Sequence, residues 1–156
     1  MKKILVLSDS HGNTVNLKAC IRAEEPFDAV IFCGDGLKDF AFVGFSGSPR
    51  RLFVPGNCDG DHPVHDADIV FEELFGRRVL VFHGHRHNVK HGEQNAAVLC
   101  RSMSADVCVF GHTHEQYLDN KGSMLILNPG SAAQGDYAVI NAESHGWDVQ
   151  FKTIGR

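Results

Sequence analysis

The first third of the chain alternates short apolar runs with segments of helical pattern. Asn13–Glu24 has the apolar spacing of a helix that begins at an Asn-Thr signal and ends before Pro26. A second, shorter helix is expected over Leu37–Val43. Ile4–Leu7 is a continuous apolar run, typical of a strand buried on both faces, and Ala29–Cys33 is expected to be a second buried strand. A third strand is expected over Arg51–Val54. This β-α-β-α-β order predicts a parallel sheet with right-handed crossovers.

The second half is richer in strands, with one helical pattern over Glu93–Met103. Strands are predicted over Ile69–Leu74, Arg78–Phe82, Val107–Phe110, Gln116–Leu118, Ser123–Leu127, Tyr137–Asn141 and Trp147–Ile154. The last two are expected to form a terminal hairpin. The chain of 156 residues suits one domain, 1–156, of the α/β class. We expect two mixed β-sheets packed face to face, with helices outside.

Composition narrows the class of protein. Apolar residues make up 43% and charged residues 22%, which is ordinary for a globular domain. The net charge is −4 and no basic run stands out, so no nucleic-acid partner is expected. The apolar run after Lys3 is too short for a signal-peptide core and no later stretch could span a bilayer, so we expect a cytoplasmic protein without membrane contact. The five cysteines form no CxxC pair, and all except Cys58 lie in apolar segments as small buried side chains.

Five predicted strands end in glycine beside Asp, Asn or His. These ends are Asp9-Ser10-His11-Gly12, Gly34-Asp35-Gly36, Gly56-Asn57-Cys58-Asp59, His83-Gly84-His85 and Gly111-His112-Thr113-His114. Carboxyl ends of parallel strands share one edge of a sheet, and glycine lets the backbone turn sharply there. Ordinary turn chemistry with solvated histidines would explain one or two such ends. It does not explain five in series, three of them with histidine.

The residue types at these strand ends indicate a metal site with mixed oxygen and nitrogen ligands. There is no thiolate pair, so a closed structural zinc site is not expected. Seven candidate ligands exceed what one tetrahedral ion needs, whereas two divalent ions about 4 Å apart that share one carboxylate would use them all. Mn²⁺ is the ion we expect, with Zn²⁺, Ni²⁺ and Fe²⁺ as alternatives.

The series of motifs, in this order, resembles the calcineurin-like metallophosphoesterase superfamily. The short chain and the Gly56-Asn57-Cys58-Asp59 segment resemble its small single-domain phosphodiesterase branch in bacteria and archaea. The resemblance covers nearly the whole chain. It implies a four-layer α/β/β/α sandwich of two mixed β-sheets, in agreement with the two-sheet prediction.

The same resemblance implies roles for the candidate ligands. One metal would be held by Asp9, His11 and His114, and the other by Asn57, His83 and His112, with Asp35 bridging the two. His83 is chosen over His85 because the first histidine of the family's His-Gly-His binds metal. The implied activity is hydrolysis of a small-molecule phosphoester, above all a phosphodiester, by in-line attack of a hydroxide that bridges the ions.

One departure from the wider superfamily concerns the group that protonates the leaving group. Many relatives carry histidine after the asparagine, where this chain has Cys58. A thiol is a poor mimic of imidazolium, and Cys58 either fills space or donates a proton. His85 is the other candidate donor, and Asp59 is expected to orient a neighbour. Together with Asn57, these are the candidate catalytic residues. We expect aryl esters to be hydrolysed faster than alkyl esters.

Two rival functions use the same fold or the same histidines. A catalytically weak protein-binding scaffold would tolerate loss of His11, His83 or His114, and the chain retains all three. A metal-buffering protein would not need Asp, Asn and His in the order along the chain that suits two neighbouring ions, so this function is the weaker alternative.

Outside the strand ends, the chain gives weaker indications. Leu127–Ser131 predicts a Pro-Gly turn beside the site. His62, His65 and His145 have no evident partner. Apolar edges at Phe40, Phe42 and Phe45 favour a homodimer or higher homo-oligomer.

Overall fold

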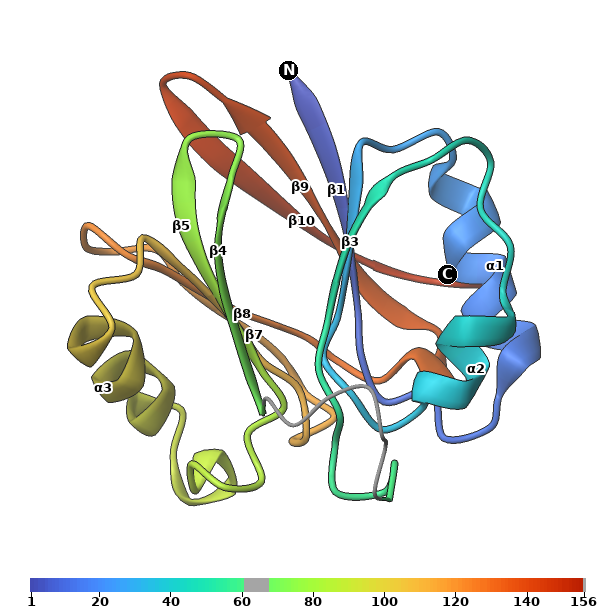
Figure 1. Ribbon diagram of the computed structural model, residues 1–156, viewed down its shortest axis with the longest axis horizontal. Helices are drawn as coiled ribbons and strands as arrows, with labels where there is room; N and C mark the ends of the chain where they lie inside the picture. Colours follow the sequence, from blue (N-terminus) through green and yellow to red (C-terminus); the bar gives the residue numbers. More distant parts are fainter. Residues whose placement is uncertain (61–67, 156) are drawn as a thin grey trace.

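Two five-stranded sheets stack face to face in the computed structural model, which describes residues 1–60 and 68–155 (Figure 1). The first sheet contains β1 (Lys2–Leu7), β2 (Ala29–Phe32), β3 (Arg50–Phe53), β9 (Asp136–Glu143) and β10 (Gly146–Thr153). The second contains β4 (Ile69–Leu74), β5 (Arg77–Phe82), β6 (Val107–Val109), β7 (Gln116–Asp119) and β8 (Leu125–Pro129). Their strand orders are β10-β9-β1-β2-β3 and β4-β5-β6-β8-β7. His62 and His65 lie outside the described residues.

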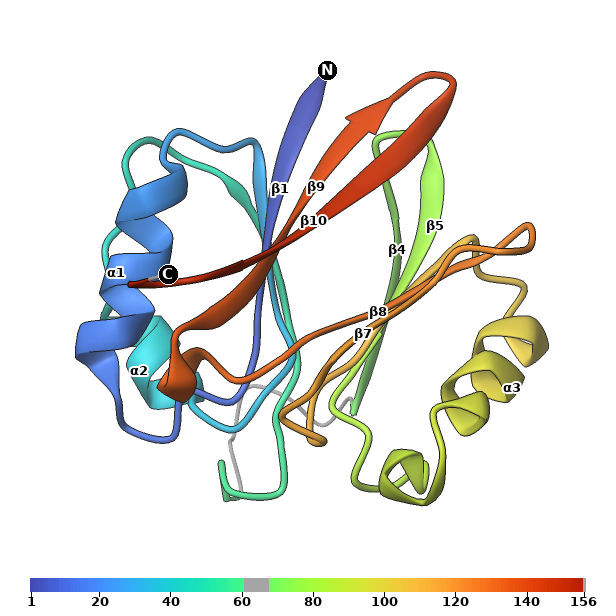
Figure 2. The same cartoon turned by 180° about the vertical axis from the view of Figure 1, so that it is seen from behind.

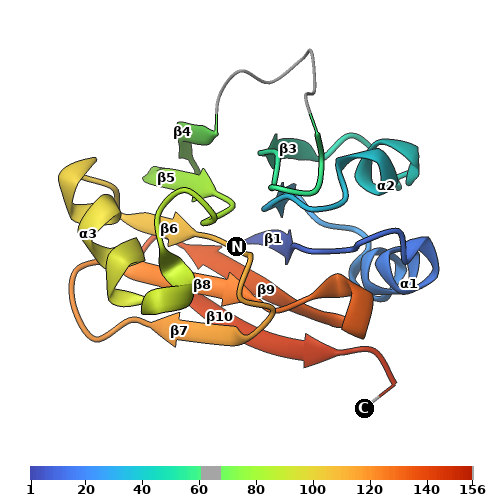
Figure 3. The ribbon, with the colours of Figure 1, turned by 90° about the horizontal axis from the view of Figure 1, so that it is seen from below.

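Helices cover the outer face of each sheet, which completes the four-layer α/β/β/α sandwich that the sequence predicts (Figures 1 and 2). The helices are α1 (Thr14–Glu24), α2 (Leu37–Phe42) and α3 (Gln94–Ser102), with 3-10 turns η1 (Val89–His91) and η2 (Ala132–Gln134). The first two cover the first sheet, and α3 covers the second. Figure 3 shows the layers from the loop side. Among the described residues, no helix has the length and apolar character needed to cross a bilayer.

The alternation of side chains along β1 shows why its apolar run is unbroken. Ile4 and Val6 belong to the core between the two sheets, whereas Leu5 and Leu7 face α1 and its neighbours. Both faces of the strand are therefore buried, so its apolar residues do not alternate with polar ones.

Helix α1 begins and ends where the sequence predicts. The Asn13 side chain caps it by accepting the backbone N–H of Asn16 at 3.1 Å. Leu17, Cys20 and Ile21 form its buried face. Burial of this apolar face, rather than intrinsic propensity, accounts for most of the stability of so short a helix.

The predicted apolar edge near α2 is wrong in part. Phe40 is buried and stacks on Phe32 with ring centroids 4.8 Å apart, and Phe45 is half-buried against Phe27 and Phe40. Phe42 alone of the three is exposed, at 84%. Helix α2 has one face that packs against the first sheet. Phe40 and Val43 are three residues apart, so they lie on the same face of the helix and both are buried.

The strand directions bring the five glycine-containing ends to one side of the molecule. β1, β2 and β3 are mutually parallel, as are β5 and β6 in the other sheet. β1 begins at the chain terminus at the top of Figure 1, and the loops after all five strands lie at the bottom. The sandwich thus presents the candidate ligands of both sheets at a shared edge.

Candidate metal centre

The backbone at the strand ends is held in an unusual conformation. Eight non-glycine residues of the described chain have positive φ, and five of them are predicted ligands. These five are Asp9 (55°), His11 (44°), Asp35 (56°), His112 (70°) and His114 (62°). Residues other than glycine adopt positive φ at a cost in free energy, and backbone strain of this kind is concentrated at functional sites. The strained backbone therefore sets the direction in which these five side chains point.

Two glycines allow the strand ends to approach one another. A Cβ atom on Gly56 would lie 2.1 Å from Asp35 Oδ1, and one on Gly111 would lie 2.0 Å from Ser8 Oγ. Neither approach is possible for a residue with a side chain. Glycine at these positions is thus a condition of the site's geometry.

Asp9, His11 and His114 form the first half of the site. The Asp9 carboxylate is fully buried, and its Oδ2 accepts the Ser8 hydroxyl at 2.5 Å and the His112 N–H at 3.0 Å. Its Oδ1 is also buried but makes no hydrogen bond within the described chain, although the Nε2 atoms of His114 and His11 lie 3.1 and 3.5 Å away. Those two nitrogens are themselves 3.1 Å apart. A buried carboxylate oxygen left without a partner costs free energy unless a ligand satisfies it.

Asn57, His83 and His112 form the second half, next to Asp35. The Nε2 atom of His83 lies 3.1 Å from Asn57 Oδ1, 3.2 Å from His112 Nδ1 and 3.3 Å from Asp35 Oδ2. On the other side of the ring, His83 Nδ1 lies 2.6 Å from the Cys33 carbonyl oxygen. A carbonyl only accepts, so Nδ1 carries a proton and Nε2 is the ring nitrogen that faces the site.

Asp35 lies between the two halves. Its Oδ2 is 3.3 Å from His83 Nε2 and 3.8 Å from His11 Nε2. Ligands on one ion at bond lengths of about 2.1 Å are separated by about 3 to 3.5 Å, so the distances in both halves fit a divalent cation.

Burial alone would raise the pKa of Asp35, but the hydrogen bond and charge of His83 hold it well below its usual range. Burial and the nearby His83 lower the pKa of His112 to about 4. An ionised carboxylate and a neutral imidazole are the forms that bind metal.

Asp59 does not join the candidate metal ligands but binds the loops that carry them. Its Oδ1 accepts the N–H groups of Gly36 and Leu37, both at 2.8 Å. Its Oδ2 accepts those of Asp35 at 2.8 Å and Gly56 at 2.7 Å. One carboxylate thus joins the ends of β2 and β3.

Cys58 and His85 lie beside the ligands without joining either half. The Cys58 N–H donates to Asp35 Oδ1 at 2.7 Å, and its side chain is exposed. The His85 ring centroid is 5.4 Å from that of His83, and its Nδ1 is buried without a hydrogen bond to the described residues. Burial lowers the pKa of His85. Of the two, His85 offers the imidazole and Cys58 the thiol.

Sequence reasoning gave no role to three polar residues that support the site. Ser8 binds Asp9, as described above. The buried Asn128 side chain donates to the Gly111 carbonyl at 2.9 Å and to Thr113 Oγ1 at 3.0 Å. Ser131 Oγ donates to the Asp9 carbonyl at 2.8 Å. The sequence predicts a turn beside the site at 127–131. In the structure this segment also binds the loop that carries His112 and His114 and the loop that carries Asp9.

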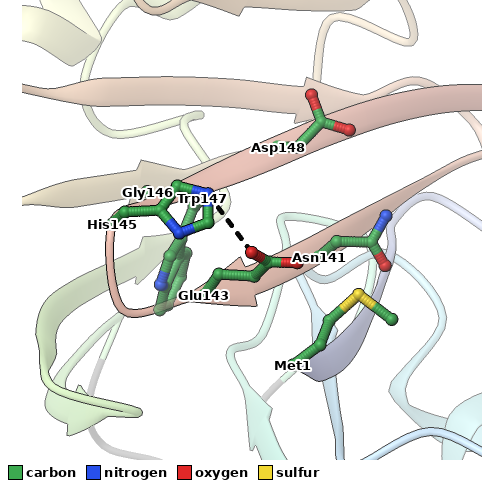
Figure 4. Close-up of a pocket in the computed structure, with 7 residues that line it drawn as sticks. All are labelled: Met1, Asn141, Glu143, His145, Gly146, Trp147 and Asp148. Atoms are coloured by element: carbon green, nitrogen blue, oxygen red, sulfur yellow. Dashed lines mark ion pairs between the residues drawn. The ribbon is translucent and has the colours of Figure 1, made fainter.

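Three hollows in the described surface differ in their chemistry. One of ≈ 350 Å³ adjoins the ligands and is lined by His11, Gly12, Asp35, Gly36, Lys38, Asp39, Cys58 and Asp59. A second, of ≈ 430 Å³, includes Thr113 and the η1 segment. The third, of ≈ 330 Å³, lies at the far end of β9 and β10, where His145 Nε2 pairs with Glu143 at 3.2 Å (Figure 4). His145 therefore has a partner that the sequence did not reveal, and it lies away from the centre.

The chain is similar along most of its length to proteins that are named phosphoesterases or probable phosphoesterases. Residues 1–144 match the model of the calcineurin-like phosphoesterase superfamily domain. The probable metallophosphoesterase YsnB of Bacillus subtilis is 31% identical, over 95% of this chain and 89% of its own. A phosphodiesterase of Methanocaldococcus jannaschii is 26% identical over 82% of each chain. The crystal structure of a predicted phosphoesterase from Streptococcus pneumoniae superposes with a TM-score of 0.76 at 26% identity, covering 97% of this chain and 89% of that one. The chain belongs to the calcineurin-like phosphoesterase superfamily.

Proposed function

We propose that this protein is a metal-dependent phosphodiesterase with a dinuclear centre. The observation that carries the proposal is the buried Asp9 Oδ1, which has no hydrogen bond to any residue that the structure describes although two imidazole nitrogens lie within 3.5 Å of it. Atoms that converge in this way without hydrogen-bond geometry are oriented toward a common ligand. The similarity to an archaeal phosphodiesterase supports the choice of a diester.

The proposed ligand sets follow the two halves of the site. Asp9, His11 and His114 would hold one ion, and Asn57, His83 and His112 the other, with Asp35 between them. We propose Mn²⁺ as the ion, because mixed oxygen and nitrogen ligands suit it. When bound, two divalent ions would supply a hydroxide near neutral pH and offset charge on the phosphoryl oxygens.

The charge of the ligand set favours an anionic substrate. Asp9 and Asp35 contribute two negative charges against the four positive charges of two divalent ions, and the imidazoles and amide are neutral. The excess positive charge attracts a phosphodiester anion to the shared edge of the sheets. The loops after β2 and β3, which Asp59 joins, would hold the ligands in place so that little reorganisation is needed during the reaction.

Proton delivery to the leaving group is the weakest step in this centre. Cys58 occupies the position after Asn57, and desolvation, followed by the nearby carboxylates of Asp35 and Asp59, raises the pKa of its thiol. A thiol so weakly acidic is a slow donor to an alkoxide. We predict that diesters with aryl leaving groups, which need no protonation, are hydrolysed at least about tenfold faster than dialkyl esters. Equal rates on matched aryl and alkyl diesters would contradict this part of the proposal.

The test is hydrolysis of bis(p-nitrophenyl) phosphate by chelator-stripped protein, with and without added Mn²⁺, beside p-nitrophenyl phosphate. The proposal predicts diester turnover that appears only with metal. The variant His83→Gln is expected to lose most of this activity, whereas the matched variant His145→Gln in the distant hollow retains it. Absence of turnover with any divalent ion, in protein that circular dichroism shows to be folded, would overturn the proposal in favour of a non-catalytic scaffold.

A further inference from the structure

A third group of potential ligands lies beside the two halves of the centre. The side chains of His11, Asp35 and Cys58 each offer one ligand atom, and these atoms all lie within 4.8 Å of one another. They come from the loops after β1, β2 and β3, so the group is assembled by the parallel part of the first sheet. It differs from the other two groups in containing sulfur.

The position of Cys58 is fixed by its neighbours. Its backbone N–H donates to Asp35 Oδ1 at 2.7 Å. The Asn57 Nδ2 atom lies 3.4 Å from Cys58 Sγ. The sulfur borders the hollow of ≈ 350 Å³ that His11 and Asp35 also line, so a cation can reach it from solvent.

We propose that Cys58, His11 and Asp35 form a selective site for a thiophilic divalent cation of the zinc and cadmium class, and that occupation of this site inhibits the enzyme. Binding replaces the thiol proton, which passes to solvent, with a sulfur–metal bond. The inference rests on the proposed function because His11 and Asp35 also serve the productive centre.

The chemistry of the donor set explains the selectivity. Thiolate binds soft and borderline ions such as Cd²⁺ and Zn²⁺ strongly, whereas Mn²⁺ prefers oxygen and nitrogen. One thiolate and one carboxylate also neutralise a divalent cation, which offsets the cost of holding it at a partly buried site. Mn²⁺ gains little from the sulfur and stays with Asp9, His11 and His114.

Inhibition follows from the sharing of ligands. An ion held toward Cys58 takes His11 and Asp35 away from the positions that the productive pair of ions requires. It also removes positive charge from the face that receives the phosphodiester, since the thiolate adds a negative charge. Loss of the shared carboxylate affects both halves at once.

The test uses Cd²⁺ as the probe, because a cadmium–thiolate bond gives an ultraviolet charge-transfer absorption that reports on sulfur alone. Cys58 is the one exposed thiol among the five cysteines, and the other four are buried, so the band is assigned to it. We expect the band to saturate at one equivalent of Cd²⁺ in chelator-stripped protein. Cys58→Ser keeps a hydrogen-bonding group of similar size and is expected to abolish the band and weaken Cd²⁺ binding by at least about tenfold. Mn²⁺ binding should change far less, and His145→Gln should leave the band intact.

The inhibition is measured separately, by adding Zn²⁺ to Mn²⁺-loaded protein that hydrolyses the diester. The inference predicts strong inhibition of the natural chain and weaker inhibition of Cys58→Ser, each normalised to its own rate with Mn²⁺. Mn²⁺-dependent hydrolysis without a cadmium–thiolate band would overturn this inference and leave the proposed function standing. A saturating band in folded protein that hydrolyses no diester would sustain the thiophilic site and refute the enzyme. Equal Cd²⁺ affinity in the natural chain and Cys58→Ser would also overturn it.

Discussion

Replacement of Asp59 by asparagine should loosen the proposed metal centre without altering any of the proposed ligands. Each carboxylate oxygen of Asp59 accepts two backbone N–H groups, Oδ1 from Gly36 and Leu37 and Oδ2 from Asp35 and Gly56. All four distances fall between 2.7 and 2.8 Å, as in charge-assisted bonds. In Asp59→Asn one oxygen becomes an NH₂ group that faces two donors, so two bonds are lost and two N–H groups lose their partner.

The expected cost follows from the strength of such bonds. A hydrogen bond to a charged group contributes about 1.5 to 3 kcal/mol, so the loss of two amounts to about 3 to 6 kcal/mol. Because the side chain at 59 is partly exposed, water can reach the broken pairs, and we expect the lower end, about 3 kcal/mol. A domain with a stability of about 5 to 15 kcal/mol survives this loss, so the variant should fold.

Urea unfolding followed by circular dichroism measures this cost, and diester hydrolysis across Mn²⁺ concentrations measures the effect on the site. We expect a higher Mn²⁺ concentration for half-maximal activity, because the loops that carry Asp35 and Asn57 are joined by fewer hydrogen bonds. The matched control is Asp39→Asn. Asp39 uses one oxygen, Oδ2, to accept from Ser10 and Gly12, and asparagine retains one such oxygen. If both variants lose the same stability, or if Asp59→Asn binds Mn²⁺ as tightly as the natural chain, the reasoning is refuted.

Two further predictions concern close packing and acid stability. Gly111→Ala would place a methyl group 2.0 Å from Ser8 Oγ and 2.7 Å from Asp9 Oδ2. Mn²⁺ affinity should therefore fall by at least about tenfold in folded protein. Unchanged affinity in a Mn²⁺ titration would contradict the predicted clash. The hydrogen bond from Arg78 lowers the pKa of Asp106 to about 2, so this carboxylate stabilises the fold above the unfolded value of about 3.9 and loses that contribution as pH falls through about 2. Because both side chains are partly exposed, Asp106→Asn should cost at most about 1 kcal/mol at pH 6 and less at pH 3, as measured by urea unfolding.

The location of the site could be predicted because strand ends carry their own sequence signal. A buried strand reads as an apolar run, and the glycine and ligand that follow it are adjacent in sequence. His11 and His114, which are 103 residues apart, could therefore be assigned to one edge before their 3.1 Å separation was known. The same reasoning placed both ends of α1, where a capping side chain marks the start.

Contacts that depend on tertiary packing gave no such signal. Asn128 and Ser131 look like ordinary turn residues in the sequence. The bond of Asn128 to Gly111 depends on the pairing of β8 with β6, and the bond of Ser131 to Asp9 depends on the chain passing beside the end of β1. The choice between His83 and His85 also needed a family pattern. In the structure the Cys33 carbonyl orients the ring of His83, and no local feature of the sequence encodes that contact. Burial of Phe40 was missed for the same reason.

The central claim is that Asp35 joins two metal sites in one centre. The most direct measurement is the number of Mn²⁺ ions bound per chain at saturation, by equilibrium dialysis and elemental analysis, for the natural chain and Asp35→Asn. The account predicts two ions for the natural chain, and weaker binding of both for the variant, because the shared carboxylate lies between His11 and His83. A single ion in the natural chain, or two ions held with undiminished affinity by folded Asp35→Asn, would contradict it.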